Sequence, residues 1–190
     1  MLPIFIAEIS SNHNQDLQRA YKFIDTATKI GCDGVKFQLF KIEELFSPEI
    51  LETSADHRIR KKWELPLEFI PKLSKKCKEN NIKFGITPFF LDAVEFIKPY
   101  VDFYKIASYE LLWDDLLIAC AQTKKSVMIS SGMAEMDEIL HAVEVLKSNG
   151  CKSPKVFHCN SAYPTTCHDT NLAVIETLRK EVNCDIGWSD

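Results

Sequence analysis

Seven short apolar runs, each followed by a cluster of polar residues, recur along this chain of 190 residues. In order, they are FIAEISSNHN, GVKFQ, FGITPF, YKIASYE, VMISSGM, VFHCNSAYP and DIGWSD. The interval between successive runs leaves room for at least one helix, so each polar cluster falls where a strand turns toward a helix. In α/β barrels the active site is assembled from such strand ends. We therefore expect the functional residues at the carboxyl ends of the strands.

The alternation of strands and helices predicts parallel strands joined by right-handed crossovers. Asp16 is placed to cap the first helix, and Gly31 is placed to end it. A long charged excursion, Leu39–Pro66, interrupts the rhythm, and excursions of this length are often lids or binding loops. The predicted strands are Ile4–Ile9, a run around Val35 and Phe37, Ile82–Ile86, Phe103–Ala107, Ser126–Ser130, Lys155–Cys159 and Cys184–Trp188.

Two architectures fit this alternation, a doubly wound open sheet and an eight-stranded barrel. A dinucleotide-binding sheet should carry GxGxxG after its first strand, whereas this chain has SSNHN there. The prediction is therefore an α/β fold of the TIM-type (β/α)8 barrel class. Such barrels typically take about 250 residues, and this sequence reaches Asp190 as the seventh strand finishes. We expect residues 1–190 to be one incomplete barrel domain without its eighth strand unit.

Composition excludes several classes of function. The formal charge of −4 and a single short basic run, Arg58 to Lys62, argue against nucleic acid as a partner. That run is either a solvated loop or a patch that meets an anionic small molecule. Seven scattered cysteines without a CxxC pair indicate reduced thiols rather than disulfides or a zinc knuckle. Because no apolar run approaches the ~20 residues of a membrane span, we expect no membrane and a cytoplasmic protein.

The ordered series AEISSNHN, DGVKFQ, ITPFFLDAVEF, DFYKIASYELLWDDLL, ISSGMAEMDEI, HCNSAYPTT and GWSD resembles the N-acetylneuraminate (sialic acid) synthase family over the whole chain. The resemblance implies condensation of phosphoenolpyruvate with an N-acetylated amino sugar, usually N-acetylmannosamine, with release of phosphate. It also implies a divalent metal, Mn²⁺ or Mg²⁺, in the full-length protein. The family continues into an eighth barrel unit and an antifreeze-like domain that reaches the partner subunit. We accordingly expect a homodimer when full length, and an inactive 190-residue chain alone.

Three charged residues are the predicted catalytic groups. Lys36 and Lys105 lie inside apolar strands, where alternation turns their ammonium groups toward the barrel interior and toward one anion. The alternative is a pair of surface lysines bound to carboxylates. Glu8 is a carboxylate on a buried strand, which is costly without a partner or a function. The resemblance makes Glu8 a ligand of the amino sugar and a candidate for proton transfer, whereas the alternative is a structural ion pair with Lys36.

The resemblance also supplies the predicted substrate-binding residues. Four hydroxyls match positions that hold substrate oxygens, although each could instead be a helix N-cap. Ser10 and Gln15 stand where the family usually has glycine, which leaves the backbone conformation of the first loop open. The predicted substrate-binding residues are Asn12, His13, Gln38, Thr87, Ser108, Ser130, Ser161, Tyr163, Ser189 and Asp190.

We predict no metal ligand within this chain. His158 precedes its strand end, and a histidine there is easily satisfied by a backbone acceptor. The metal histidines of the family lie after the SD dipeptide and on the eighth strand. Alternative functions remain open at this point: legionaminate or pseudaminate synthesis within the same family, a Schiff-base aldolase that uses Lys105, or a non-catalytic barrel remnant.

Overall fold

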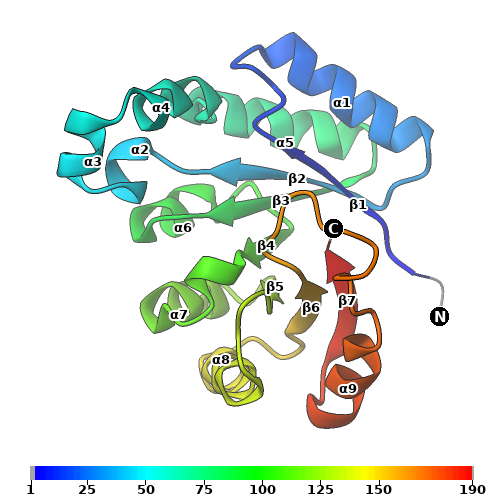
Figure 1. The fold of residues 1–190 in the computed structure, drawn as a ribbon. Coiled ribbons are helices and arrows are strands. Elements are labelled where there is room, and N and C mark those ends of the chain that lie inside the picture. Colours follow the sequence, from blue (N-terminus) through cyan, green and yellow to red (C-terminus); the bar gives the residue numbers. More distant parts are fainter. Residues whose placement is uncertain (1–2, 190) are drawn as a thin grey trace. The chain divides into compact units, whose positions relative to one another are not determined.

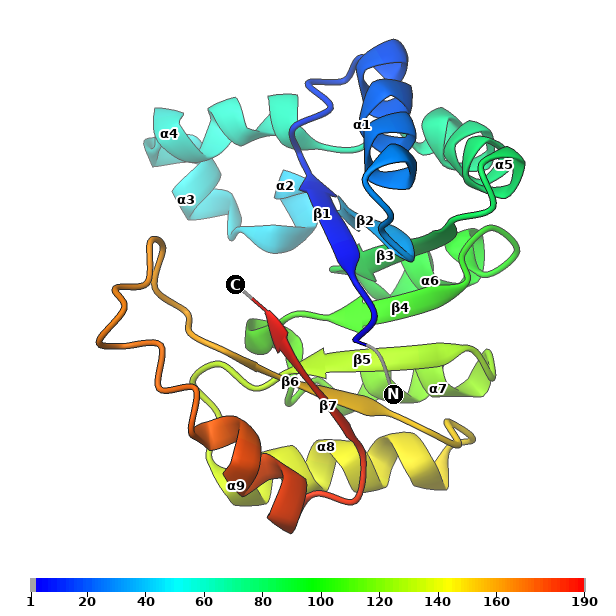
Figure 2. The same ribbon diagram turned by 90° about the vertical axis from the view of Figure 1, so that its right-hand side faces the viewer.

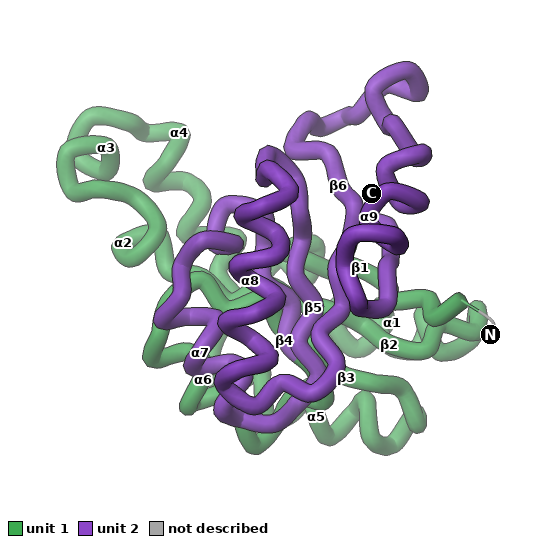
Figure 3. The backbone as a smooth tube through the Cα atoms, turned by 90° about the horizontal axis from the view of Figure 1, so that it is seen from below, with its two compact units in different colours: residues 1–103 green, residues 104–190 purple. Residues whose placement is uncertain are grey.

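The structure of this chain is a computed structural model, in which residues 3–189 are described (Figure 1). Strands and helices alternate throughout that range. The chain divides into two compact units, residues 1–103 and 104–190, which are coloured separately in Figure 3. Each unit is described by itself below. No helix in residues 3–189 has the length and apolar character needed to cross a membrane.

The first unit contains three neighbouring parallel strands, β1 (Ile6–Ser10), β2 (Gly34–Leu39) and β3 (Lys83–Pro88). In the register of β1 and β2, Glu8 lies opposite Lys36, and the pairing shifts between Glu8 and Ser10. The predicted first strand began too early. Ile4 and Phe5 are 63% and 61% exposed and precede β1, because an apolar sequence alone does not show whether a neighbour covers it.

Two helices cover one face of these strands. Helices α1 (Leu17–Lys29) and α5 (Ile70–Glu79) lie side by side, as Figures 1 and 2 show. Asp16 caps α1 as predicted, since its carboxylate accepts the N–H groups of the second and third helical residues. Gly31 ends α1 with a φ of +85°, which glycine adopts without strain. The residues buried under the two helices include Ala20, Ile24, Ala27, Ile70, Leu73 and Cys77.

The excursion between β2 and α5 is a succession of short helical turns rather than an irregular loop. This segment, residues 41–66, is called the excursion from here on. Its two ends are joined, because the Glu64 carboxylate accepts the N–H of Ile42 at 2.8 Å. Lys61 forms an ion pair with Glu43 across the same closure. The elements of the excursion are α2 (Ile42–Leu45), α3 (Pro48–Thr53), α4 (Ala55–Arg58) and η1 (Ile59–Trp63). Outside it, η2 (Leu67–Phe69) lies just before α5, and α6 (Leu91–Ile97) follows β3.

The second unit repeats the strand and helix alternation. Strands β5, β6 and β7 pair in parallel in that order. The predicted bounds of β5 and β6 are confirmed, and the other strands differ from prediction by one or two residues at their ends. The elements are β4 (Phe103–Ile106), whose first residue belongs to the first unit, η3 (Ser108–Glu110), α7 (Asp114–Gln122), β5 (Ser126–Ser130), α8 (Met136–Ser148), β6 (Lys155–Cys159), α9 (Val174–Glu181) and β7 (Asp185–Ser189).

Apolar contacts between helices and strands form the core of this unit. Helices α7 and α8 pack together, and α9 contacts β6 and β7 (Figure 2). An exposed polar contact joins the helix pair, where the His141 ring lies 3.0 Å from the Asp114 carboxylate. The buried residues include Leu116, Leu117, Cys120, Ala121, Val127, Ile129, Ile139, Ala142, Val143, Leu146, Val156 and Leu178.

Glycines on the strands make room for two aromatic rings. In the first unit, a Cβ added at Gly85 would lie 2.1 Å from the ring of Phe103. In the second unit, a Cβ added at Gly187 would lie 2.7 Å from the ring of Phe157. Because Cβ atoms do not approach other heavy atoms so closely, each ring occupies space that only glycine leaves open.

Candidate active site

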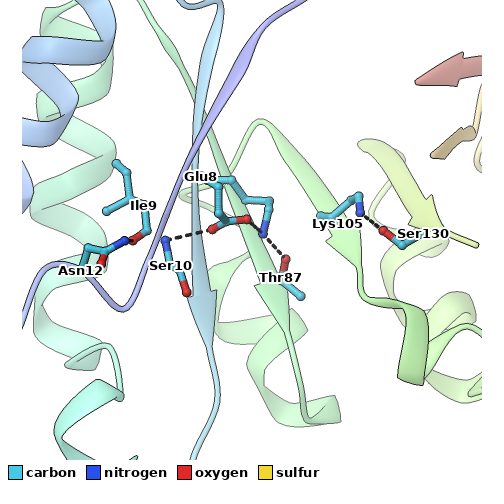
Figure 4. Close-up of polar contacts among 8 residues, drawn as sticks. Glu8, Ile9, Ser10, Asn12, Thr87, Lys105 and Ser130 are labelled. Atoms are coloured by element: carbon cyan, nitrogen blue, oxygen red, sulfur yellow. Dashed lines mark hydrogen bonds and ion pairs between the residues drawn. The ribbon is translucent and has the colours of Figure 1, made fainter. Parts of the chain in front are cut away.

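Three side chains of neighbouring strands meet in the first unit (Figure 4). The Lys36 ammonium donates to the Thr87 hydroxyl at 2.8 Å and forms an ion pair with Glu8. The second carboxylate oxygen of Glu8 accepts the backbone N–H of Ser10 at 2.9 Å. The Lys36 side chain is 12% exposed and that of Glu8 is 42% exposed. The cluster is therefore an ordered charge pair that still opens to solvent on the Glu8 side.

The position of Lys36 follows from strand alternation. Its neighbours Val35 and Phe37 are fully buried, and the Phe37 ring packs edge to face on Phe84. Side chains at alternate positions point to opposite faces, so Lys36 and Gln38 share the other face. Gln38 lies opposite Thr87 in the register of β2 and β3. The ion pair between Glu8 and Lys36 that we considered as an alternative is present, and it does not exclude a catalytic role for either residue.

The loop after β1 is built around His13. This side chain is fully buried, and its Nδ1 accepts the N–H of Gln15 at 3.0 Å. That bond places the ring proton on Nε2, which is buried without a hydrogen-bond partner in residues 3–189. Burial lowers the pKa of His13, so the ring is neutral. Asn12 lies nearby and its side-chain amide donates to Ile9 O at 3.0 Å. Substrate binding by Asn12 and His13 remains a prediction.

Ser10 and Gln15 adopt the conformation that glycine favours. Their φ angles are +49° and +54°, both in the left-handed region. The backbone path expected of a glycine is therefore kept by two residues that carry a Cβ, at a cost on the order of 1 kcal/mol each. Gln15 offsets this cost with its side chain, whose amide donates to Lys61 O at 3.0 Å and Glu64 O at 3.1 Å. The first loop is thus bonded directly to the excursion.

The second unit carries its own buried lysine. Lys105 is 7% exposed, and its ammonium donates to the Ser130 hydroxyl (Figure 4). The same ammonium lies 5.1 Å from the centroid of the Phe157 ring, within the range of a cation–π interaction. Its low exposure shields the Lys105 ammonium from most of the solvent. An anion therefore finds here a cation that has lost much of its hydration.

Two serine hydroxyls and a thiol converge over Gly132. A Cβ added there would lie 2.6 Å from Ser161 Oγ, 2.7 Å from Ser108 Oγ and 3.0 Å from Cys159 Sγ. Ser108 Oγ and Cys159 Sγ are 3.1 Å apart. Since Gly132 has no side chain, the hydroxyls can lie directly over the backbone. We missed Gly132 in the sequence, although the small-residue run SSGM after a strand was a usable signal.

The alternative that these hydroxyls cap helices is wrong. The N-cap residues of α6, α7, α8 and α9 are Phe90, Trp113, Glu135 and Ala173. Thr87 and Ser130 instead accept hydrogen bonds from Lys36 and Lys105. The predicted hydroxyls therefore do not cap these helices, which begin at other residues.

Glu110 is a second residue that sequence reasoning missed. It lies two positions after Ser108 in η3, and its Oε2 is buried without a hydrogen-bond partner in residues 3–189. Burial raises the pKa of Glu110 above the ordinary glutamate value. A carboxyl group with a raised pKa and an unused oxygen is typical of a proton donor or acceptor. The available signal was a glutamate two residues after the run YKIAS.

The remaining predicted residues lie at the ends of β6 and β7. Tyr163 is 84% exposed. Tyr163 and Ser189 line an open cavity of about 350 Å³, together with Trp188. Asp190, which we predicted to bind substrate, lies outside the described residues.

His158 has the backbone partner that we predicted. It is buried, and its Nε2 lies 2.8 Å from Thr170 O. Among residues 3–189, no group of three or more His, Cys, Asp or Glu side chains is arranged to hold a metal ion. The residues described therefore do not fit the metal that the resemblance implies, and no chemical step below is assigned to one.

Comparison with known proteins identifies the family of this chain. The family model described as "NeuB family" matches residues 23–190. The chain belongs to the NeuB family. Residues 3–189 have the predicted α/β barrel fold, with the seventh strand at their end. The solved structure of a truncated 3-deoxy-D-arabino-heptulosonate 7-phosphate synthase from Thermotoga maritima supports the fold alone, with 14% identity and a TM-score of 0.72 over 97% of this chain and 63% of that one.

Three relatives and one further structure cover nearly all of this chain. An uncharacterized protein of Methanocaldococcus jannaschii is 37% identical over 99% of the chain. An N,N'-diacetyllegionaminic acid synthase and a pseudaminic acid synthase, both of Campylobacter jejuni, are 34% and 31% identical over 98% and 97% of it. The N-acetylneuraminic acid synthetase of Leptospira borgpetersenii, solved with citrate, is 33% identical with a TM-score of 0.90 over 100% of this chain and 65% of that one. The chain spans 55%, 60% and 57% of the three relatives' lengths.

Proposed function

We propose that this chain supplies catalytic residues for the condensation of phosphoenolpyruvate with an N-acetylated amino sugar, giving a nonulosonic acid and phosphate. Membership of the NeuB family supports this reaction, as do the names of the relatives. The observation that carries the proposal is the placement of the two lysines. Lys36 lies on β2 and Lys105 on β4, and each places its ammonium group on a hydroxyl oxygen of a neighbouring strand.

The chemistry needs fixed positive charge and a route for protons. The methylene carbon of phosphoenolpyruvate forms a bond to the aldehyde carbon of the open-chain sugar, and the aldehyde oxygen takes up a proton. Water adds to the cationic carbon that results, and the tetrahedral adduct then expels phosphate to leave a ketone. In the proposal, Lys105, Ser108 and Ser161 hold the phosphate charge, which is largest as it leaves. Lys36, in the first unit, is proposed to bind an anionic substrate oxygen there.

The two carboxyl groups take different parts in this proposal. Glu8 is charged and paired with Lys36, so it suits orientation of the sugar hydroxyls and transfer of a proton near the aldehyde. Glu110 has a raised pKa and an unused oxygen, so it suits release of a proton.

The sugar is proposed as N-acetylmannosamine or a related hexosamine. The legionaminic and pseudaminic acid synthases among the relatives make the corresponding diacetylated sugars the first alternatives. A Schiff-base aldolase that uses Lys105 predicts borohydride trapping with a carbonyl substrate, and a non-catalytic role predicts no affinity for phosphoenolpyruvate. The homodimer, the divalent metal of the full-length protein and a cytoplasmic location belong to the same proposal.

Phosphate release with phosphoenolpyruvate and a panel of N-acetylated amino sugars tests the reaction and identifies the sugar. Glu8→Gln keeps the shape of the side chain and removes its charge. We expect this variant to fold and to bind phosphoenolpyruvate normally, with turnover lower by at least ~100-fold. If it unfolds or loses phosphoenolpyruvate binding instead, Glu8 serves only the ion pair with Lys36. Absence of phosphate release with every sugar would remove the synthase proposal.

A further inference from the structure

The excursion holds one arginine between two aromatic rings. The Arg60 guanidinium lies 5.4 Å from the centroid of the Phe46 ring and 5.7 Å from that of the Trp63 ring. On Phe46, the His57 ring packs edge to face at 4.7 Å, and Ser54 Oγ lies 2.7 Å from His57 Nδ1. These four residues in contact, His57, Phe46, Arg60 and Trp63, are called the Arg60 column. Stacking restricts a side chain that is otherwise among the most mobile in proteins.

The segment that carries the column is fastened at both ends. The Glu64 carboxylate accepts the N–H of Ile42, and Lys61 pairs with Glu43. The side-chain amide of Gln15 then donates to the carbonyls of Lys61 and Glu64. The left-handed φ of Gln15 shows that the chain accepts backbone strain at the residue that makes these two bonds. The column is therefore part of an ordered module and not of a loose loop.

Arg60 differs from the other cations of its run in what it contacts. Arg58 is used internally, since one of its guanidinium nitrogens donates to Leu51 O at 2.7 Å and Glu52 O at 2.9 Å. Lys61 is taken by its ion pair with Glu43. Within residues 3–189, Arg60 contacts two ring faces and has no hydrogen bond or ion pair. Its N–H groups lie in the plane of the guanidinium, and ring contacts on the faces do not use them.

We propose that Arg60 is the binding residue of an anion site on the excursion, for a small molecule that carries a carboxylate or phosphate group. A guanidinium presents two parallel N–H donors, which match the paired oxygens of either group. Contact with two aromatic rings restricts the orientations of the cation and displaces part of its hydration, which strengthens its attraction for an anion. The site is separate from the cluster of Glu8, Lys36 and Thr87, and it does not depend on the proposed synthase reaction.

Trp63 provides a local reporter for the test. In the chain with Trp113→Phe and Trp188→Phe, Trp63 is the only tryptophan, and its fluorescence is followed during titration with inorganic phosphate or with malonate. Sodium chloride at matched ionic strength controls for screening. Three further variants are made in this background: Arg60→Gln, Arg60→Lys and Lys62→Gln. Lys62 is the matched control, because it has the same charge, lies two residues away and has no ring contact among residues 3–189.

We expect saturable binding of at least one anion, and the anion that binds more tightly identifies the ligand group. Arg60→Gln should weaken binding by at least ~10-fold, and Arg60→Lys by about 5-fold because a lysine keeps the charge but not the planar pair of donors. Lys62→Gln should change binding by less than about 2-fold. Equal loss in the Arg60 and Lys62 variants, or no saturation with either anion, would overturn the site. So would loss of the signal on Lys105→Met, which would place the anion at the candidate active site instead.

Discussion

Replacing Gln15 by glycine tests two opposing contributions to stability at this residue: the strain of its left-handed backbone and the hydrogen bonds of its side chain to the excursion. Glycine relieves the left-handed backbone strain, which is worth on the order of 1 kcal/mol. It also removes two exposed amide hydrogen bonds to the excursion, at 3.0 and 3.1 Å, which together contribute about 1 kcal/mol at the low end of the usual range. The greater freedom of glycine in the unfolded chain costs about a further 0.5–1 kcal/mol.

For Gln15→Gly, these magnitudes predict a small change in the free energy of unfolding of the whole chain and a larger change in the local opening of the excursion. The free energy of unfolding should fall by less than about 1 kcal/mol, because strain relief offsets most of the loss. The excursion loses the two bonds without any gain, so its local opening should become about 5-fold more frequent. Hydrogen exchange at the Ile42 and Glu64 amides reports this opening, since the N–H of Ile42 is bonded to the Glu64 carboxylate and that of Glu64 to Lys61 O.

Asn14→Gly is the matched control for this experiment. Asn14 also has a left-handed φ, of +49°, and its side chain makes no hydrogen bond among residues 3–189. The control should leave unfolding nearly unchanged and exchange at Ile42 and Glu64 unaltered. If Gln15→Gly matches the control in both measurements, the two amide bonds do not hold the excursion. A marked gain in stability for Gln15→Gly would likewise refute the reasoning, because strain would then outweigh the bonds.

Three further predictions concern Lys105, Gly132 and Glu110 of the second unit. Lys105→Met should weaken phosphoenolpyruvate binding by at least ~100-fold in calorimetric titration, since a buried cation has no substitute there, and near-normal affinity would remove it from the site. Gly132→Ala should keep the fold but weaken phosphoenolpyruvate about 10-fold by displacing two hydroxyls, whereas Gly34→Ala, whose added Cβ meets atoms only at 3.4 Å or beyond, should leave affinity unchanged. Burial raises the pKa of Glu110, so the folded chain holds this proton more tightly and loses stability as pH rises above the ordinary value of 4.5. Glu110→Gln should therefore be more stable than the parent in urea at pH 7 and nearly equal to it near pH 4, and a pH-independent difference would contradict the assignment.

The strands could be predicted because their apolar runs are short and are followed by clusters of polar residues. Strands β5 and β6 have the predicted bounds, since each is a short, largely buried run that follows a lysine or a proline. The start of β1 could not be predicted in this way, because Ile4 and Phe5 are as apolar as the residues that follow them. Whether an apolar residue pairs in a sheet depends on its neighbours in space, which the local sequence does not contain.

The excursion shows a different limit of sequence reasoning. Its length and charge indicated a separate segment, but nothing in the sequence showed that Gln15 would bond to it. A glutamine at a position where glycine is usual left the loop conformation open. The structure resolves this, because the side chain supplies bonds that offset the strain of the backbone. Tertiary contacts of this kind override local preference and leave no periodic signal.

At the candidate site, charged residues inside apolar strands were the predictable part. Lys36 and Lys105 stood out because burial of an ammonium group is unusual, and both lie against a hydroxyl oxygen in the structure. Gly132 and Glu110 were not predicted. The role of Gly132 lies in the space it leaves, and that of Glu110 in the missing partner of one oxygen. Neither property can be read before the neighbouring side chains are placed.

The close fit of Gly85 against Phe103 has an evolutionary consequence. The two residues share one volume, so neither can change alone without a void or a collision. Among relatives, positions 85 and 103 should therefore covary: a relative with alanine or serine at the first should carry a smaller apolar residue at the second. The same coupling is expected between Gly187 and Phe157. Such paired changes would show that the packing volume at each of these two contacts is kept while the residues that fill it differ between relatives.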